Sequence, residues 1–171
     1  MTKEDKLFRE LEKGSDTALE ELTRMYYPDI FQYCLWHMPN RSAAEDAAQE
    51  TFLKALRYFD RYTHKGQFRA FLYRIAANTC IDMKRKKWPD EPIPENITVM
   101  EDSYAQVEAR QDFMLLLTGL SEETKEMLIL RYQQDLTVKE VANVMNLPMR
   151  TVQSRLRRTL KKLKEKLSKG G

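Results

Sequence analysis

Side chains that can hydrogen-bond to DNA recur along one side of a segment near the C-terminal end of this 171-residue chain. Arg and Gln can make paired hydrogen bonds to base edges, and Ser can reach bases or phosphates. At helical spacing, one side of the segment carries Arg150, Gln153, Ser154, Arg157 and Lys161. Flanking cations suited to phosphates are Arg155, Arg158, Lys162 and Lys164. The pattern predicts a DNA-binding helix, with an ordinary solvated basic helix as the alternative.

A second group combines acids and an amide with an apolar centre. At helical spacing, one face of the segment that follows Ser42 carries Asp46, Gln49, Glu50 and Leu53. Single exposed apolar residues are common and need no explanation. An acidic patch around an apolar centre is also typical of a protein-docking surface. Both interpretations stay open on the residues alone.

A third group follows a polar, aromatic and basic loop over residues 60–67. At steps of three and four, the next segment carries Phe71, Arg74, Asn78, Asp82 and Arg85. Aromatic, amide and guanidinium groups in one row can hold single-stranded nucleic acid. The alternative is a polar helix flank with a partly buried Phe.

The DNA-binding segment needs a tight turn before it. Thr137 with Glu140 fits a capping box that starts a short helix. The next helix can begin at Pro148, because Pro suits a first helical turn but not a helix interior. Its apolar side is expected to consist of Met149, Val152, Leu156, Leu163 and Leu167. A short helix, a turn and a basic second helix form a helix-turn-helix.

Helices are predicted for the remainder of the first half. A short helix over 2–13 ends at Gly14, and a longer one capped by Ser15 or Asp16 runs to about Met38. Pro28 predicts a kink or break in the longer helix. Ser42 with Glu45 predicts the cap of the next helix, whose core stripe is Ala48, Phe52, Ala55, Leu56 and Phe59. The helix from about Phe68 to Lys87 is expected to bury Phe68, Leu72, Ile75 and Thr79.

Composition changes after this helix. Residues 89–103 are rich in prolines and acids and predict a flexible acidic linker. Ser103 with Gln106 starts a helix to about Leu117, and Ser121 caps another. We therefore predict an all-α fold with two small helical domains, 1–88 and 104–171, the second containing the helix-turn-helix.

Charge and cysteine content narrow the functional classes. Net charge is only +3, but basic residues cluster at 84–87 and in the last helix, which indicates two contacts with a polyanion.

The charged N-terminus does not resemble a signal peptide, and apolar runs are too short to span a membrane. Cys34 and Cys80 have no metal-ligand spacing around them. Reduced thiols in a cytoplasmic protein are favoured over a disulfide or redox switch, and no cofactor or metal is expected.

Three stretches resemble a known family. DAAQETFLKALRYFDRY, GQFRAFLYRIAANTCIDMKRKK and the segment from LSEETKEM to KEKL are similar to the bacterial extracytoplasmic-function (ECF) sigma factors. The resemblance implies a subunit of RNA polymerase holoenzyme that recognises promoters. Its first domain, sigma region 2, would dock on the clamp helices of the largest core subunit and capture the melted −10 element. Its second, sigma region 4, would bind the −35 duplex and pack on the flap of the other large subunit.

Roles for individual residues follow from the resemblance. The clamp contacts would be Asp46, Gln49, Glu50 and Leu53. The −10 contacts would be Arg61, Tyr62, His64, Lys65, Gln67, Phe71, Asn78, Asp82 and Arg85. The −35 contacts would be Arg150, Thr151, Gln153, Ser154, Arg155, Arg157, Arg158 and Lys162. Phe71 departs from the Trp usual in the family, which affects stacking at that position. An anti-sigma factor, commonly associated with the membrane, is a further implied partner.

Other classes of protein remain as alternatives. A stand-alone helix-turn-helix regulator usually dimerises on palindromic sites, but the chain offers no long dimer seam or sensor pocket. A sigma mimic that binds only an anti-sigma factor would not need Arg150 or Arg157. An enzyme is least favoured, because His37 and His64 lack nearby residues that would form an active site and no Gly-rich phosphate loop is present.

Overall fold

The structure is a computed structural model that describes residues 2–59, 67–87 and 104–170. All regular structure within these ranges is helical, as the sequence predicted. The chain divides into two compact units, residues 1–97 and 98–171. The predicted linker 89–103 lies outside the described residues. In the first unit the helices are α1 (Lys3–Glu12), α2 (Asp16–His37), α3 (Arg41–Tyr58) and α4 (Phe68–Lys87). In the second they are α5 (Tyr104–Leu117), α6 (Glu122–Leu128), the π-helix η2 (Ile129–Gln133), α7 (Val138–Met145) and α8 (Met149–Gly170).

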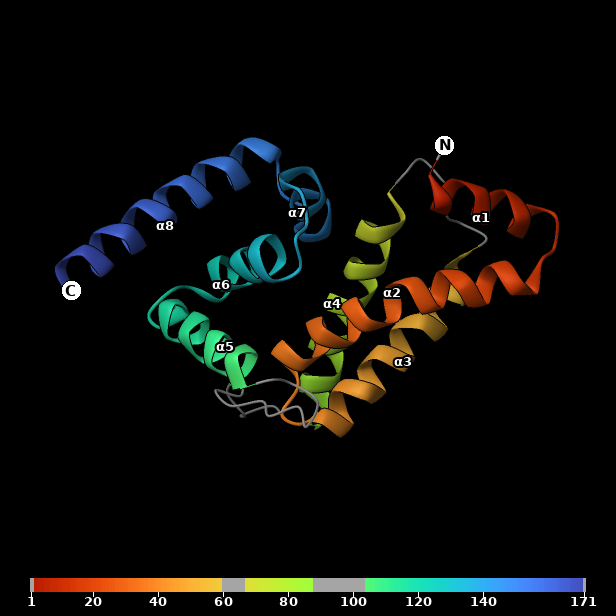
Figure 1. The fold of residues 1–171 in the computed structure, drawn as a ribbon, viewed down its shortest axis with the longest axis horizontal. Coiled ribbons are helices and arrows are strands. Elements are labelled where there is room, and N and C mark those ends of the chain that lie inside the picture. Colours follow the sequence, from red (N-terminus) through yellow and green to blue (C-terminus); the bar gives the residue numbers. More distant parts are fainter. Residues whose placement is uncertain (1, 60–66, 88–103, 171) are drawn as a thin grey trace. The chain divides into compact units, whose positions relative to one another are not determined.

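The first unit is built around α2, which packs against α1, α3 and α4 (Figure 1). Gly14 has a φ of 86° and lets the chain turn from α1 into α2, whose first turn is capped by Ser15. Tyr33 of α2 and Tyr73 of α4 are buried, with ring centroids 5.4 Å apart. Burial of such large side chains on both helices holds α4 firmly against α2.

Parts of three local predictions for this unit are wrong. Of the kink or break predicted at Pro28, the break does not occur, since α2 runs from Asp16 to His37 with Pro28 inside it. Because Arg24 and Pro28 are both exposed, water can bind the Arg24 carbonyl that Pro28 leaves without an amide donor. α3 starts one residue before Ser42, because Asn40 supplies the cap by accepting a hydrogen bond from the Ala43 N–H at 2.8 Å. Leu56 is 47% exposed rather than part of the core. Small residues instead form the buried stripe of α3: Ala43, Ala44, Ala47, Ala48, Thr51 and Ala55.

The second unit contains the predicted helix-turn-helix. Thr137 and Glu140 form the expected capping box, with hydrogen bonds of 2.9 and 3.1 Å. Asn146 ends α7 with a left-handed φ of 54°, and the Leu147 N–H returns to the Ala142 carbonyl at 2.9 Å. α8 then packs against both α6 and α7.

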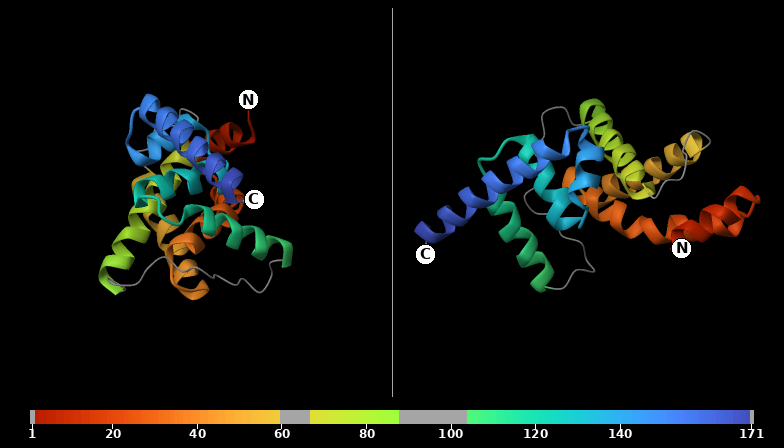
Figure 2. Two further views of the ribbon diagram at one scale, coloured as in Figure 1. Left: turned by 90° about the vertical axis from the view of Figure 1, so that its left-hand side faces the viewer. Right: turned by 90° about the horizontal axis from the view of Figure 1, so that it is seen from above.

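The apolar side of α8 is only partly buried. Val152 and Leu156 are buried, whereas Met149 and Leu167 are exposed, the latter by 61%. α8 continues as one long helix past the other helices of this unit, which explains why its last apolar residues are not covered within the unit (Figure 2). The apolar side that the spacing predicted is therefore not buried along its whole length.

Candidate protein- and DNA-binding surfaces

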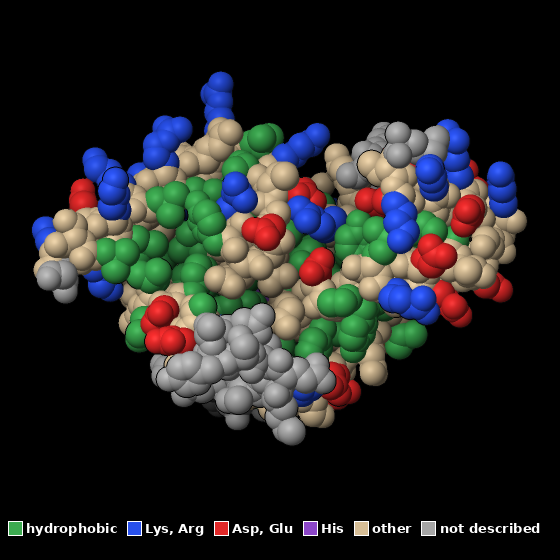
Figure 3. Space-filling model, viewed as in Figure 1, with side chains coloured by type: hydrophobic (Ala, Val, Ile, Leu, Met, Phe, Trp, Pro, Cys, Tyr) green, Lys and Arg blue, Asp and Glu red, His purple; other side chains and the backbone are tan. Residues whose placement is uncertain are grey.

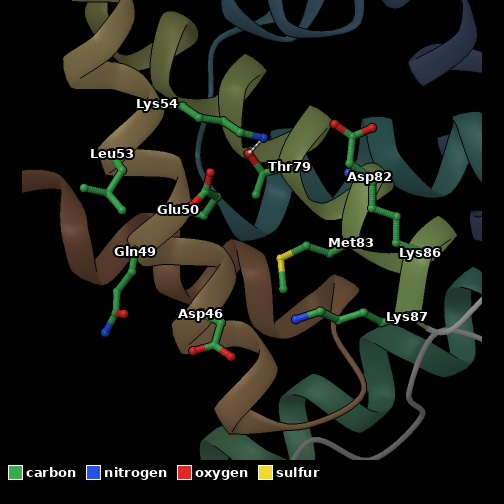
Figure 4. A pocket seen from close by; sticks show the side chains of 10 residues that line it. All are labelled: Asp46, Gln49, Glu50, Leu53, Lys54, Thr79, Asp82, Met83, Lys86 and Lys87. Atoms are coloured by element: carbon green, nitrogen blue, oxygen red, sulfur yellow. Dashed lines mark hydrogen bonds between the residues drawn. The ribbon is translucent and has the colours of Figure 1, made fainter.

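A groove lies between α3 and α4 in the first unit (Figure 4). Its volume is about 490 Å³. The lining residues are Asp46, Gln49, Glu50, Leu53, Lys54, Thr79, Asp82, Met83, Lys86 and Lys87. The four residues predicted to contact polymerase thus lie together with α4 residues, and one predicted −10 residue, Asp82, shares the groove with them.

The α3 side of the groove has an apolar centre between polar side chains. Asp46 and Gln49 are exposed, Glu50 is half-buried, and Leu53 is 53% exposed. The small residues of α3 occupy the opposite side of the helix against α2 and α4, which leaves these larger side chains directed outward. We call Asp46, Gln49, Glu50 and Leu53 the acidic patch. Its exposed Leu is a group that a partner could desolvate on docking.

The α4 residues predicted to contact single-stranded DNA lie outside the core. Asn78, Asp82 and Arg85 are exposed, while Phe71 is half-buried with its ring 5.9 Å from that of Phe68. Gln67 is exposed, and its carbonyl accepts a hydrogen bond from the Phe71 N–H at 3.1 Å. The other predicted −10 residues, Arg61, Tyr62, His64 and Lys65, lie outside the described residues. The structure therefore shows that the α4 residues of the set are accessible, and their contact with DNA stays a prediction.

Residues predicted to contact duplex DNA occupy the outward side of α8. Figure 3 shows Lys and Arg side chains along one side of α8 and hydrophobic side chains along the other. Exposed members of the predicted set are Arg150, Gln153, Ser154, Arg157, Arg158 and Lys162. Thr151 and Arg155 are half-buried. Arg155 also forms an ion pair with Glu123 of α6, which the sequence pattern did not predict.

Sequence reasoning missed Lys54 in the groove and Arg131 in the second unit. Lys54 lines the groove and donates a hydrogen bond to Thr79 at 3.3 Å. Its place four residues after Glu50 puts it on the same face of α3, and this spacing could have identified it.

Arg131 in η2 donates to the Leu136 carbonyl at 3.2 Å and lies 5.5 Å from the Tyr132 ring centre. This hydrogen bond fixes the turn that leads into α7. A π-helix at this point has no periodic signal in the sequence.

The two cysteines, far apart in sequence, meet in the core of the first unit. The Cys34 and Cys80 sulfurs lie 3.9 Å apart, within hydrogen-bonding distance for thiols, and both residues are buried. The hydrogen bond with Cys80, together with burial, raises the pKa of Cys34 well above its ordinary value. In the described part of the chain, His, Cys, Asp and Glu form no group of three that could hold a metal ion. The same residues include no helix that could cross a membrane.

Both halves of the chain match models of one protein family. Residues 22–89 match the family model for Sigma-70 region 2, and residues 110–163 match that for Sigma-70 region 4. The ECF RNA polymerase sigma factor SigW of Bacillus subtilis is 28% identical over 95% of each chain. SigM of the same organism is 27% identical over 90% of this chain and 97% of its own. This chain belongs to the ECF sigma factor family.

Solved structures agree with the fold of this ECF sigma factor. CnrH, solved in complex with the cytosolic domain of CnrY, has a TM-score of 0.71 at 21% identity and covers 96% of this chain and 97% of its own. The sigma factor RpoE of Bartonella quintana, solved with the anti-sigma factor NepR, has a TM-score of 0.69 at 22% identity, with coverages of 87% and 96%. Because both sequence identities are low, these two structures support a shared fold and nothing further.

The matched segments of the sigma factor contain all three candidate surfaces. The region 2 match includes the acidic patch on α3 and the exposed row on α4. The region 4 match includes the outward side of α8 from Arg150 to Lys162. All three candidate surfaces therefore lie within the segments that match the family models.

Proposed function

We propose that this ECF sigma factor binds core RNA polymerase through its first unit and directs initiation at promoters with defined −10 and −35 elements. The observation that carries the proposal is the presence, on one chain, of the acidic patch in the region 2 match and of a basic, exposed α8 in the region 4 match. The proposed domains are residues 1–88 for region 2, 89–103 for the linker and 104–171 for region 4.

The acidic patch is the proposed contact with the clamp helices of the largest core subunit. Exposed acids steer encounter with a basic partner, while burial of an apolar side chain contributes most of the lasting contact. Leu53, with Asp46 and Glu50 beside it, has both features. Lys54, Lys86 and Lys87 line the same groove, so the partner should also present acids at its edge.

The exposed row of α4 is the proposed contact with the melted −10 strand. An amide and a carboxylate can hydrogen-bond to the edge of an unpaired base, and Arg can contact the backbone or stack on a base. Asn78, Asp82 and Arg85 supply these groups from one helix. The loop residues Arg61, Tyr62, His64, Lys65 and Gln67 are proposed to complete the pocket, with Phe71 as an aromatic support.

The outward side of α8 is the proposed reader of the −35 duplex. A recognition helix enters the major groove with its N-terminal turns, which in α8 carry the exposed Arg150 and Gln153. We assign these two residues mainly to bases and Arg158 and Lys162 mainly to phosphates. The apolar residues left exposed in the second unit, such as Leu115 and Leu160, are available for the flap of the other large subunit.

An inhibitory anti-sigma factor is a further proposed partner. CnrH and RpoE were each solved in complex with another protein, in the second case one named as an anti-sigma factor. A partner that covers the exposed acidic patch and α8 would block both polymerase and DNA. We propose that such a partner holds this chain in the cytoplasm, at the inner face of the membrane.

In vitro transcription with core polymerase on a pool of promoters tests the proposed function. A sigma factor should direct initiation from a subset that shares −10 and −35 sequences. Core polymerase alone is the control. A stand-alone regulator would instead bind duplex DNA tightly without polymerase, and a mimic would bind neither polymerase nor DNA. Either outcome contradicts the proposal.

A further inference from the structure

An ion pair joins the recognition helix to the rest of the second unit. The guanidinium Nη1 of Arg155 contacts the carboxylate Oε1 of Glu123. Glu123 lies in the first turn of α6, and Arg155 lies in the second turn of α8. The contact therefore connects two helices whose relative orientation sets how α8 is presented to DNA.

Arg155 does not lie in the exposed basic row of α8. Its neighbours at i−3 and i+4, Val152 and Thr159, are both buried, so its side of the helix adjoins the core. Its side chain is 30% exposed. Arg158 differs, because its neighbours at i−4 and i+4, Ser154 and Lys162, are exposed. The two arginines are thus suited to different roles, although they are only three residues apart.

Glu123 is held by a well-anchored helix. It follows the cap residue Ser121, whose hydroxyl accepts a hydrogen bond from the Thr124 N–H at 3.2 Å. A carboxylate in the first turn interacts favourably with the helix dipole. Met127 and Leu128 of the same helix are buried, which ties α6 into the core of the unit. Glu123 therefore offers Arg155 a fixed anchor.

We propose that Arg155 is a positioning residue for −35 recognition: its ion pair with Glu123 sets the orientation of α8, and it does not neutralise a DNA phosphate. The proposal rests on the −35 role proposed above for α8. It replaces the sequence-based expectation that Arg155 contacts a phosphate. It also assigns a role to Glu123, which the sequence pattern did not single out.

The two roles predict opposite effects for Glu123. If Arg155 were a phosphate ligand, Glu123 would compete with DNA for it, and removal of Glu123 would strengthen binding. If the ion pair orients α8, removal of either partner should weaken binding by the same amount. A phosphate contact also contributes about one unit to the slope of log affinity against log salt, whereas an internal ion pair does not.

The test uses holoenzyme and measures promoter affinity at several salt concentrations, with matched and mismatched −35 sequences. The variants are Arg155→Gln, Glu123→Gln, the double variant and the charge swap Glu123→Arg with Arg155→Glu. Arg158→Gln is the matched control for a phosphate contact. Thermal unfolding of each chain confirms that the second unit is folded at the assay temperature.

We expect each single variant to weaken binding to the matched promoter about two- to fivefold, with an unchanged salt slope and reduced discrimination against the mismatch. The double variant should be no worse than either single one, and the charge swap should recover most of the loss. Arg158→Gln should lower the salt slope by about one and leave discrimination intact. If a substitution instead destabilised the second unit, binding to the matched and mismatched promoters would weaken equally and the unfolding temperature would fall.

Tighter binding by Glu123→Gln, a salt slope reduced by about one in Arg155→Gln, or parental behaviour of all the pair variants would each overturn the proposal. Failure of the charge swap to recover discrimination in a folded chain would also overturn it. If the parental holoenzyme itself does not distinguish the two −35 sequences, the proposed −35 function fails instead. The parental measurement therefore separates the two hypotheses.

Discussion

Lys54 of α3 donates a hydrogen bond to the side chain of Thr79 in α4 at 3.3 Å, and Thr79 donates its own hydroxyl proton to the Ile75 carbonyl at 2.8 Å. Thr79 is fully buried at the floor of the groove, whereas Lys54 is half-buried at its side. This link joins the helix that carries the acidic patch to the helix that carries Asn78 and Asp82. A partner bound at one surface therefore contacts a helix directly tied to the other.

Replacement of Thr79 by Val tests the contribution of this link. Val keeps the shape of the side chain but removes the acceptor for Lys54 and the bond to Ile75. A hydrogen bond of this kind contributes about 1 kcal/mol to stability, and somewhat more when its partner is charged. We expect Thr79→Val to lower the free energy of unfolding by about 1–2 kcal/mol, measured by urea denaturation.

The matched control is Thr51→Val in the same unit. Thr51 is as fully buried as Thr79 and makes the same type of bond to a carbonyl four residues earlier, that of Ala47, at 2.7 Å, without a lysine donor across a helix interface. Its replacement should cost less than that of Thr79. Equal losses in the two variants would show that Lys54 contributes nothing to the stability of the interface.

Charge reversal in the acidic patch should impair polymerase binding. Asp46→Arg combined with Glu50→Arg replaces two acids beside the exposed Leu53 with bases. Unfavourable charges at a docking site cost several kcal/mol, so we expect core affinity to fall at least about a hundredfold. Core binding can be measured by fluorescence anisotropy of labelled sigma factor, with circular dichroism as a check on helix content.

The control variant makes the same change of net charge elsewhere in the first unit. Glu12 of α1 and Glu20 of α2 are both exposed and lie outside the groove. Glu12→Arg with Glu20→Arg should leave core affinity within about twofold of the parent. A similar loss in both double variants would indicate a non-specific effect of charge and reject the acidic patch as the docking site.

Asn78→Ala should affect promoter melting more than holoenzyme assembly. The amide is exposed on α4, and removing it should cost about 1–3 kcal/mol if it hydrogen-bonds to an unpaired base. Permanganate footprinting should show fewer reactive thymines at the −10 region, while core affinity stays unchanged. Ile81→Ala, at an exposed apolar residue of the same helix, is the control. Identical footprints for Asn78→Ala and the parent would reject this role.

Local sequence signals predicted the helices well and their packing less well. The capping box of Thr137 and Glu140 involves groups three residues apart, so its chemistry is visible in the sequence. The cap of α3 was predicted two residues too late, because Asn40 and Ser42 are both good cap residues and only the backbone conformation distinguishes them. Leu56 is exposed because α3 packs through its small residues, and an apolar repeat does not distinguish that side from one that includes Leu56.

Contacts between distant segments were not predictable from spacing. Cys34 and Cys80 meet because α2 and α4 pack together, and the contact of Arg155 with Glu123 depends on how α8 crosses α6. Neither pair follows a helical repeat. The outward positions of Arg150, Gln153 and Arg157 were predicted correctly, since a single amphipathic helix determines them.

The buried cysteine pair should make stability depend on alkaline pH. In the folded chain, the hydrogen bond with Cys80 and burial raise the pKa of Cys34 well above 9.0. The unfolded thiol ionises near its ordinary pKa, so the stabilising effect is complete below pH 9 and is lost as pH rises toward the folded value. We expect the free energy of unfolding to fall more steeply above pH 9 for the parent than for Cys34→Ala.

Thiol alkylation provides a second measurement on the same pair. Both thiols should react slowly with iodoacetamide in the folded chain and rapidly in urea, because only the exposed thiolate is a good nucleophile. Parallel pH profiles for the parent and Cys34→Ala, together with fast alkylation of the folded chain, would contradict the buried, protonated state of Cys34.

Two variants of α8 should distinguish contacts with bases from electrostatic contacts with phosphates. Arg150 lies at the start of α8 and is exposed, and a paired contact between Arg and guanine contributes about 1–3 kcal/mol of discrimination. Lys162 lies three turns further along, where a phosphate contact would act on every sequence alike. Arg150→Ala should therefore relax preference at one or two −35 positions, while Lys162→Ala should weaken all promoters equally and lower the salt slope by about one. The measurement is transcription by holoenzyme from matched and singly mismatched −35 promoters at several salt concentrations. Equal losses on matched and mismatched promoters for Arg150→Ala would leave Arg150 with an electrostatic role only.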